Sequence, residues 1–457
     1  RNDTVRFLLP TIIAPRYGDP GKAGLQPHQI PGADILAENR FHLRVAITGK
    51  LASADCESPS HQVAVEKSEG KTIVTLASGR AFMDRDFILN MRSTEKDKDA
   101  ALLGRDLDDG YVVLASFAPC FPAQKEAGPR SVKILVDCSG SMNGDSIAQA
   151  RQAVSDCLGH LRPTDFFNLF VFGDTCRALF KQQVPASTEN LTRARRQLRG
   201  LNADLGGTEM IRAVLFTVNT PGPPIPQDIL LITDGETWES EGIIATARES
   251  NHRVFSVGVG SAVSEAFIRK IAAETGGASE MAAPNEEMAE KIVRHFHRIY
   301  LSRADKVKMR WPTDPKKVVP PVLPPVFDGD TLHVFAFFNE KPQGEATLEI
   351  TLTDDRSFSG SVSIPDHLSD DVKKDRLPGT LARMGIQKSF HDQNNQDHAA
   401  QALRYQLISS WTSYIVVAER EENEKEQGRD LPVLRKVPQM LAAGWGGTGT
   451  VQSVTEP

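Results

Sequence analysis

Short runs in which apolar and polar residues alternate fill the chain from about residue 39 to residue 120. Gly, Ser and Asp residues, which favour turns, separate these runs. The runs are Phe41–Ile47, Lys71–Leu76, Asp86–Leu89 and Tyr111–Phe117. Alternation of this kind predicts antiparallel β-strands that bury one face and expose the other to water.

The pattern changes between residues 126 and 305, where continuous apolar runs alternate with segments of helical period. The apolar runs are Val132–Val136, Phe166–Phe172, Ile229–Ile232 and Arg253–Val259. The helical segments lie near Ser146–Leu161, Thr208–Asn219, Glu239–Asn251, Ser264–Thr275 and Asn285–Tyr300. Buried strands that alternate with helices predict an α/β domain with a doubly wound, mostly parallel sheet.

A second β pattern extends from residue 306 to 365. Its expected strands are Thr331–Phe338 and Ala346–Leu352, after a stiff Pro-rich connector at Val318–Pro325. Neither β stretch can form a core alone, because a layer with one apolar face must bury that face against another layer. We therefore predict that 39–125 and 306–365 form one antiparallel β-sandwich into which the α/β domain of 126–305 is inserted.

The two ends of the chain differ from these parts. Residues 1–38 contain neither an initiator Met nor a basic leader followed by an apolar core, so we expect the end of an upstream domain and a linker. Residues 366–457 predict a polar linker, a helix at Ala399–Ile408, a strand at Tyr414–Ala418 and a flexible tail that includes Gly444–Gly449.

Composition narrows the classes of function. The chain has 457 residues and a formal charge of −6, with 53 basic and 59 acidic residues, so it has no electrostatic signature of a nucleic-acid partner. It contains no stretch of about 18 apolar residues, so we expect no membrane span. The five cysteines form no CxxC pair, which argues against zinc and thioredoxin-like sites and leaves the compartment open.

Three short segments carry the candidate chemistry. Asp137–Ser141 (DCSGS) directly follows the first apolar run, Gly206–Thr208 (GGT) opens a later helix, and Thr233–Gly235 (TDG) ends the run Ile229–Ile232. In a doubly wound sheet all three lie at or beside the carboxyl ends of strands, where such folds bind ligands. The sequence therefore predicts one site at this edge.

The side chains of these segments suit a hard divalent cation. Three hydroxyls and two carboxylates offer the all-oxygen shell that Mg²⁺ prefers, with Mn²⁺ or Ca²⁺ as alternatives. The predicted metal ligands are Asp137, Ser139, Ser141, Thr208 and Asp234. So few protein ligands leave a coordination position open, and an acidic side chain of a protein partner is expected to fill it.

Longer segments resemble a known family. KILVDCSGSMNGDSI (Lys133–Ile147), the GGT loop and DILLITDGE (Asp228–Glu236) resemble the metal-ion-dependent adhesion site of von Willebrand A domains. Four further segments resemble parts of inter-alpha-trypsin inhibitor heavy chain-like proteins, which combine a vault-protein/inter-alpha-trypsin (VIT) domain with an A domain: Phe7–Tyr17, Ser58–His61, Asp84–Leu89 and Ala402–Arg420. The resemblance thus spans nearly the whole chain.

The resemblance implies a doubly wound A domain in which hydroxyls hold the metal, while Asp137 and Asp234 act directly or through water. It also implies binding of proteins or matrix components. The chain departs from the family pattern at Asp204 and Leu205, where further small residues are more usual. The heavy-chain cleavage sequence Asp-Pro-His-Phe is also absent, since Lys316 follows Asp314-Pro315, which removes support for covalent linkage.

Other candidate sites have simpler structural explanations. Gly258-Val-Gly260 lacks the third Gly of a nucleotide fingerprint and suits a tight turn. The acidic and histidine clusters suit a turn and a solvated linker; they are Asp106–Gly110 and His391, Asp392, Asp397 and His398. Cys138, between two predicted ligands, is expected to be a buried thiol rather than a redox centre.

These observations favour a metal-dependent protein-binding module rather than an enzyme. A hydrolase would need a general base near the metal-bound water, and only Glu209 and Glu236 lie close in sequence. A scaffold in which the metal only holds loops together is the second alternative. Chelation distinguishes the three, because it would abolish partner binding, unfold a scaffold or stop turnover.

Overall fold

The computed structural model divides into two compact units. Unit 1 comprises Glu95–Gln124 and Ser302–Arg435; unit 2 comprises Asn2–Thr94, Lys125–Leu301 and Lys436–Pro457. The structure describes residues 4–12, 32, 34, 36–93, 99–121, 128–235, 237, 240–261, 263–283, 286–301, 303–352, 355–369, 379–390, 397–409, 412, 438 and 440. The predicted strand Tyr414–Ala418 and the tail Gly444–Gly449 lie outside these residues.

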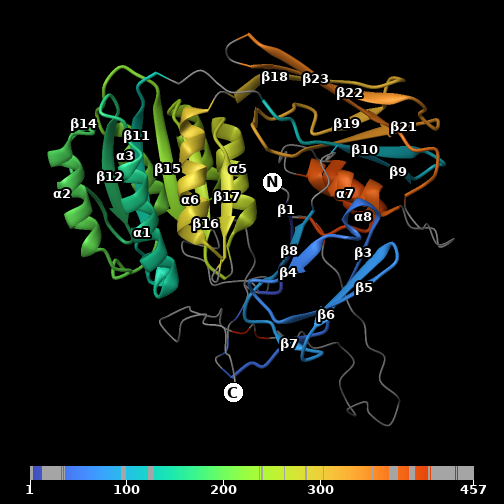
Figure 1. Cartoon of the computed structure of the whole chain (residues 1–457), viewed down its shortest axis with the longest axis horizontal. Helices are drawn as coiled ribbons and strands as arrows, with labels where there is room; N and C mark the ends of the chain where they lie inside the picture. The colour runs from blue at the N-terminus through green and yellow to red at the C-terminus, as the bar shows by residue number, and fades with distance from the viewer. Residues whose placement is uncertain are drawn as a thin grey trace, which may run out of the picture. The chain divides into compact units, whose positions relative to one another are not determined.

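The larger part of unit 2 is a mixed sheet with helices on both faces (Figure 1). Its strand order is β13-β12-β11-β15-β16-β17, and β14 also pairs with β12. The parallel strands are β11 (Ser131–Asp137), β12 (Phe166–Phe172), β15 (Gln227–Thr233), β16 (Arg253–Val259) and β17 (Ser279–Ala282). The short antiparallel strands are β13 (Cys176–Ala178) and β14 (Val184–Pro185).

The helices complete a doubly wound fold, as predicted. One layer holds α1 (Asp145–Gly159), α2 (Thr188–Arg199) and α6 (Met288–His297), followed by η3 (Arg298–Tyr300). The other holds α3 (Met210–Asn219), α4 (Ser240–Glu249) and α5 (Glu265–Thr275), whose apolar sides share a buried core with the sheet. The sequence pattern missed α2, β13, β14 and β17.

A buried lysine fixes one end of α3. Lys133 of β11 has no exposed surface, and its Nζ donates to the carbonyl oxygens of Val218 (3.1 Å) and Thr220 (3.0 Å). The same Nζ lies 3.0 Å from Nε2 of His252. Since the last carbonyls of a helix lack partners within the helix, the ammonium group satisfies the C-terminal end of α3.

The rest of unit 2 is a small β region with its own core. Its sheets have the orders β1-β8-β4, β3-β6-β5 and β2-β7. The strands are β1 (Thr4–Leu9), β2 (Arg40–Phe41), β3 (Arg44–Thr48), β4 (Asp55–Glu57), β5 (Val63–Ser68), β6 (Lys71–Leu76), β7 (Ala81–Phe82) and β8 (Phe87–Arg92), with η1 at Gly49–Leu51. Val74, Phe87 and Leu89 are fully buried in the core between these sheets.

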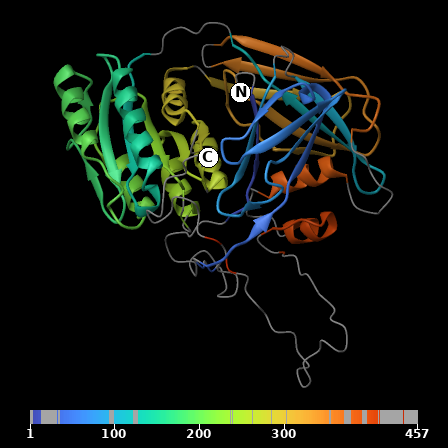
Figure 2. The same ribbon diagram turned by 60° about the horizontal axis from the view of Figure 1, so that its bottom comes forward.

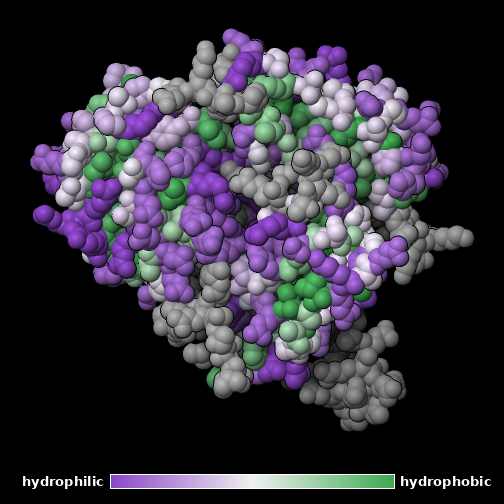
Figure 3. All heavy atoms as spheres, in the orientation of Figure 1, coloured by the Kyte–Doolittle hydropathy of each residue, from purple (hydrophilic) through white to green (hydrophobic). Residues whose placement is uncertain are grey.

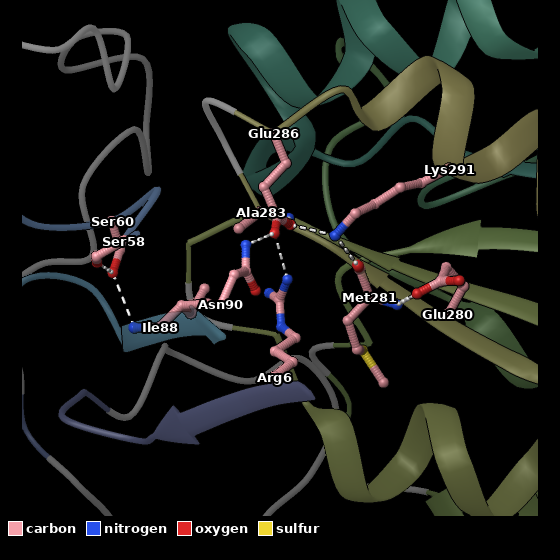
Figure 4. A network of polar contacts seen from close by, with 10 residues as sticks. All are labelled: Arg6, Ser58, Ser60, Ile88, Asn90, Glu280, Met281, Ala283, Glu286 and Lys291. Atoms are coloured by element: carbon pink, nitrogen blue, oxygen red, sulfur yellow. Dashed lines mark hydrogen bonds and ion pairs between the residues drawn. The ribbon is translucent and has the colours of Figure 1, made fainter. Parts of the chain in front are cut away.

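A polar network connects this β region to the loop before α6 (Figure 4). Glu286 forms ion pairs with Arg6 of β1 and with Lys291 of α6, the latter at 2.8 Å. Asn90 of β8 donates to the same carboxylate at 3.1 Å. Only 5% of the Glu286 side chain is exposed, and its charged and hydrogen-bonded partners outweigh burial and lower its pKa to about 2.

Unit 1 is a two-layer sandwich with helices on one of its sheets. One sheet has the order β19-β21-β10-β9, and the other has the order β20-β18-β22-β23. The bounds are β9 (Ala100–Arg105), β10 (Tyr111–Phe117), β18 (Arg303–Arg310), β19 (Lys317–Val319), β20 (Val326–Phe327), β21 (Leu332–Phe338), β22 (Glu345–Leu352) and β23 (Ser357–Ser363). The helices α7 (Thr380–Ser389) and α8 (Asp397–Tyr405) pack on the outer face of the first sheet (Figure 2).

The sandwich differs from the one expected over 39–125 and 306–365. Its two sheets share a core to which β10, β21 and β22 contribute, so only the last part of 39–125 belongs to it. The strands between residues 40 and 92 pair among themselves and with β1 instead. An alternating pattern shows which face is buried but not which strand covers it, and that explains the difference.

Candidate metal centre

Asp137 ends β11 at the carboxyl edge of the unit 2 sheet and is completely buried. Its Oδ2 accepts a 2.6 Å hydrogen bond from the hydroxyl of Thr233, and its Oδ1 accepts from the backbone N–H of Ser139 at 2.9 Å. Burial raises the pKa of this carboxyl, although both hydrogen bonds act to lower it. A cation beside Asp137 would favour the ionised form.

The two predicted serine ligands are in direct contact. The Oγ atoms of Ser139 and Ser141 lie 3.1 Å apart, with Ser141 inside the 3₁₀ turn η2 (Gly140–Met142). Cys138 points elsewhere, since its Sγ contacts the carbonyl oxygen of Val136 and is buried. Burial raises the pKa of its thiol to about 12, which favours the protonated form.

Backbone hydrogen bonds hold the GGT loop against this turn. Gly140 N–H donates to the carbonyl of Gly206 at 2.9 Å, and Leu205 N–H donates to the carbonyl of Cys138 at 3.0 Å. Thr208 is 9% exposed, and among the residues that the structure describes its Oγ1 has no hydrogen-bond partner. Buried hydroxyls usually have a partner, so this one has capacity for a ligand.

An acidic residue supports the same loop from the neighbouring strand connection. Asp174 lies between β12 and β13, and its Oδ1 accepts from the N–H of Gly207 at 2.7 Å. Gly206 has a φ of +74°, and a Cβ at this position would overlap the Asp174 carboxylate. Sequence reasoning missed Asp174, because nothing in its spacing marks it. Thr233 was missed as a positioning residue, although it directly precedes Asp234.

Asp234 follows β15 and is 5% exposed. Its carbonyl accepts from the N–H of Ser264 at 3.0 Å, and Gly235 N–H donates to Oγ1 of Thr233 at 3.0 Å. The fold thus brings the three predicted segments to one edge. Within the described part of the chain, no group of three or more His, Cys, Asp or Glu side chains could hold a metal.

The alternative candidates have structural roles where they are described. Gly258 lies in β16, where a Cβ would collide with Val263 and Met281, whereas Gly260 follows the strand with a φ of +130°. Asp106 pairs with Lys316 at 3.0 Å and accepts from the Tyr405 hydroxyl at 2.8 Å. Of the histidine cluster, Asp397 and His398 begin α8 and His398 is buried, whereas His391 and Asp392 lie outside the described residues.

Of the two acidic residues considered as general bases, the structure describes only Glu209. Glu209 precedes α3 and lies 3.5 Å from Arg212 in an exposed ion pair. Glu236 is outside the described residues.

No described helix is both long enough and apolar enough to cross a membrane.

Comparison with known proteins agrees with the α/β fold of this part of the chain. Residues 130–281 match the von Willebrand factor type A domain. The chain contains a von Willebrand A domain. The matched region includes all five predicted ligands and most of the sheet of unit 2, so this part is called the A domain below.

Relatives with the same domain extend the similarity beyond it. The human von Willebrand factor A domain-containing protein 5A is 26% identical over 482 aligned residues, covering 94% of this chain and 60% of that protein. A von Willebrand factor A domain-containing protein of Dictyostelium discoideum is 24% identical over 418 residues, covering 87% and 50%. The chain therefore spans little more than half of the length of these relatives.

Solved structures with a similar fold include a von Willebrand factor type A protein from Catenulispora acidiphila, at 16% identity and a TM-score of 0.38. That match covers 67% of this chain and 87% of the other. The ArnB paralog VWA2 from Sulfolobus acidocaldarius is 15% identical with a TM-score of 0.33 and the same coverage.

Proposed function

We propose that the A domain binds one divalent cation of the Mg²⁺ class and uses it to hold a carboxylate of a partner protein. Ser139, Ser141 and Thr208 would supply hydroxyl oxygens, and Asp137 and Asp234 would act directly or through water. Mn²⁺ or Ca²⁺ would occupy the same oxygen set. When bound, the cation offers an electrophilic centre to an acidic side chain. The A domain itself supports a protein-interaction role in general.

The observation that carries the proposal is the buried Thr208 hydroxyl, which has no partner among the described residues. A buried hydroxyl that gives up its hydrogen bond to water costs about 1–3 kcal/mol, so a bound ligand would offset this cost. Contact between the Ser139 and Ser141 hydroxyls places two further neutral oxygens in the turn joined to the Thr208 loop. Neutral ligands leave more positive charge on the ion for a carboxylate.

The metal claim is tested by calorimetric titration of Mg²⁺ into the chelator-treated full chain. We expect one site, its loss in Asp137→Ala, and its retention in Asp156→Ala, which removes a carboxylate on α1 that contacts Gln152. Equal binding by Asp137→Ala would refute the proposed site. A crystal structure with Mg²⁺ then tests the open position, because six protein oxygens around the ion would leave no place for a partner.

Chelation separates this function from the two alternatives. An adhesion-type site predicts that the circular dichroism of the chain is unchanged in EDTA. A metal that only holds loops together predicts that the A domain unfolds in EDTA. A metal-dependent hydrolase, in which Glu209 or Glu236 would serve as base, predicts turnover of a substrate that EDTA stops.

We also propose that the whole chain has the architecture of the VIT-plus-A-domain, inter-alpha-trypsin inhibitor heavy chain-like proteins, with residues 1–38 belonging to the end of a VIT domain and its linker. The resemblance of Phe7–Tyr17, Asp84–Leu89 and Ala402–Arg420 supports this assignment. The boundaries 126–305, 306–365 and 366–457 stay predictions, whereas 39–125 is divided near residue 94 between the two units. Limited proteolysis tests them, because cuts should fall near these boundaries.

A further inference from the structure

A groove of about 720 Å³ lies on the A domain away from the metal centre. It is lined by the connection between β13 and β14 and by α2 and α3; the residues include Leu179, Phe180, Lys181, Arg193, Phe216 and Asn219. Thr208 precedes the first turn of α3, whereas Asn219 ends this helix. Ten residues of helix span about 15 Å, so the groove and the metal centre are separate.

Aromatic side chains form the apolar part of this groove. Phe216 is 45% exposed although its ring packs edge-on against Phe170 of β12, with 6.0 Å between centroids. Phe180 packs in the same way against Phe167 at 5.9 Å. Packing on the core fixes the orientation of both rings, and a large aromatic surface on a fixed frame suits contact with a partner.

The rim of the groove is basic. Arg193 of α2 lies over the Phe180 ring at 5.0 Å, and Lys181 is exposed beside it. The exposed side of α2 continues the positive charge with Arg195, Arg196 and Arg199, against one acidic residue on the helix, Glu189. Among the described residues these five cations form no ion pair. Hydrophilic side chains gather over α2 at the left of Figure 3.

We propose that this basic aromatic groove is a second docking surface, which binds an acidic segment of a partner protein that carries an aromatic or aliphatic anchor. Charge complementarity identifies the occupant, because Lys181 and Arg193, which form no ion pair among the described residues, line an apolar floor on a chain whose net charge is −6. That negative total opposes long polyanions such as nucleic acid, whereas a short acidic segment meets only the local positive field. The proposal does not depend on the metal.

Fluorescence polarisation of the full chain tests the groove with a fluorescein-labelled peptide, in which Asp and Glu residues flank one Phe. We expect saturable binding that is equal in Mg²⁺ and in EDTA and that weakens as salt rises. Arg193→Glu should weaken it at least about tenfold, since attraction becomes repulsion. Arg294→Glu on α6 is the matched charge reversal and should bind as the parent chain does.

A second pair of variants tests the apolar floor. Phe216→Ser should weaken peptide binding by about tenfold or more, whereas Leu215→Ser should leave it unchanged, because Leu215 is similarly exposed (42%) but does not line the groove. Circular dichroism checks that each variant is folded. Equal loss in both serine variants would refute the groove as the binding site.

Three further results would overturn the proposal in different ways. Loss of peptide binding in EDTA would assign the carboxylates to the metal centre, and so would support the proposed function while removing this second surface. Tighter binding to labelled single-stranded DNA, or to vesicles containing phosphatidylserine, would replace the acidic peptide with another class of partner. Absence of peptide binding would leave the groove without the assigned occupant, whatever the metal titration shows.

Discussion

The hydroxyl of Thr233 donates a 2.6 Å hydrogen bond to Oδ2 of Asp137 and joins the ends of two neighbouring parallel strands. The Thr233 hydroxyl oxygen also accepts a hydrogen bond from the N–H of Gly235 at 3.0 Å. Thr233 therefore positions both the Asp137 carboxylate and the turn that carries Asp234. A residue that orients a metal ligand in this way affects metal affinity without touching the ion.

Replacing Thr233 by valine keeps its shape and removes this hydroxyl. We expect Thr233→Val to weaken Mg²⁺ binding by about 10- to 100-fold in calorimetry, because Asp137 loses its orienting donor. The matched control is Thr217→Val in α3, where the hydroxyl is buried and has no partner among the described residues. That variant should bind Mg²⁺ normally and be as stable as the parent or slightly more so. Unchanged Mg²⁺ affinity in Thr233→Val would contradict the positioning role.

The GGT loop has no room for a side chain at Gly206, two residues before Thr208. In Gly206→Ala the new methyl would overlap the Asp174 carboxylate, in addition to the strain of a positive φ. We expect loss of Mg²⁺ binding, because displacement of this loop moves Thr208. Gly79→Ala has the same kind of φ (+76°) but open space around it, so it should cost only about 1–2 kcal/mol and leave Mg²⁺ binding intact. If both variants bind Mg²⁺ equally well, the loop tolerates the clash.

The Glu286 network should contribute stability that depends on pH. The folded pKa of about 2 lies below the ordinary 4.5, so the unfolded chain binds more protons between these values. The stabilisation is therefore complete above about pH 4.5 and is lost as pH falls towards 2. Glu286→Gln should lower the free energy of unfolding by about 2–3 kcal/mol at neutral pH, measured by urea denaturation, and by progressively less as pH falls below about 4.5. Glu274→Gln, which breaks a more exposed pair with Arg248, should cost at most about 1 kcal/mol.

Lys133 predicts a second pH window, at alkaline pH. Burial lowers the pKa of this lysine from 10.5 to about 8, so the unfolded chain binds the extra proton between these values. The free energy of unfolding should therefore rise with pH from about 8 to about 10.5, by up to about 3 kcal/mol. Lys133→Met should lack this rise, which urea denaturation of both chains across that range would measure. A parallel pH dependence in the two chains would show that Lys133 titrates normally.

The sequence predicted the strands of the A domain, and the edge of the sheet at which the candidate ligand segments meet, for one physical reason. Carboxyl ends of parallel strands meet at one edge, so DCSGS after β11 and TDG after β15 had to lie close together. Helix α2 was missed because only Ala194 and Leu198 are buried along it, which gives little apolar periodicity among its arginines. The role of Asp174 depends on a loop conformation that no local pattern shows.

The sandwich was predicted less well than the A domain. Apolar alternation identified β6, β10 and β22, but the register and partner of each strand depend on contacts between distant residues. Thus β10 pairs with β21, more than two hundred residues away, while β6 pairs with its neighbours β3 and β5. Both choices bury an apolar face, and the sequence pattern does not distinguish them.

The contact of Glu286 with Arg6 and Asn90 means that a buried charge next to the A domain is neutralised by residues outside that domain. The matched residues 130–281 do not include Glu286. An isolated domain that is extended through α6 would contain Glu286 and Lys291 but neither Arg6 nor Asn90. The freed carboxylate would regain water at the surface once covered by β1 and β8. The isolated domain should therefore unfold at a lower temperature than it does within the full chain, because it lacks the positive charge that Arg6 of β1 places beside Glu286.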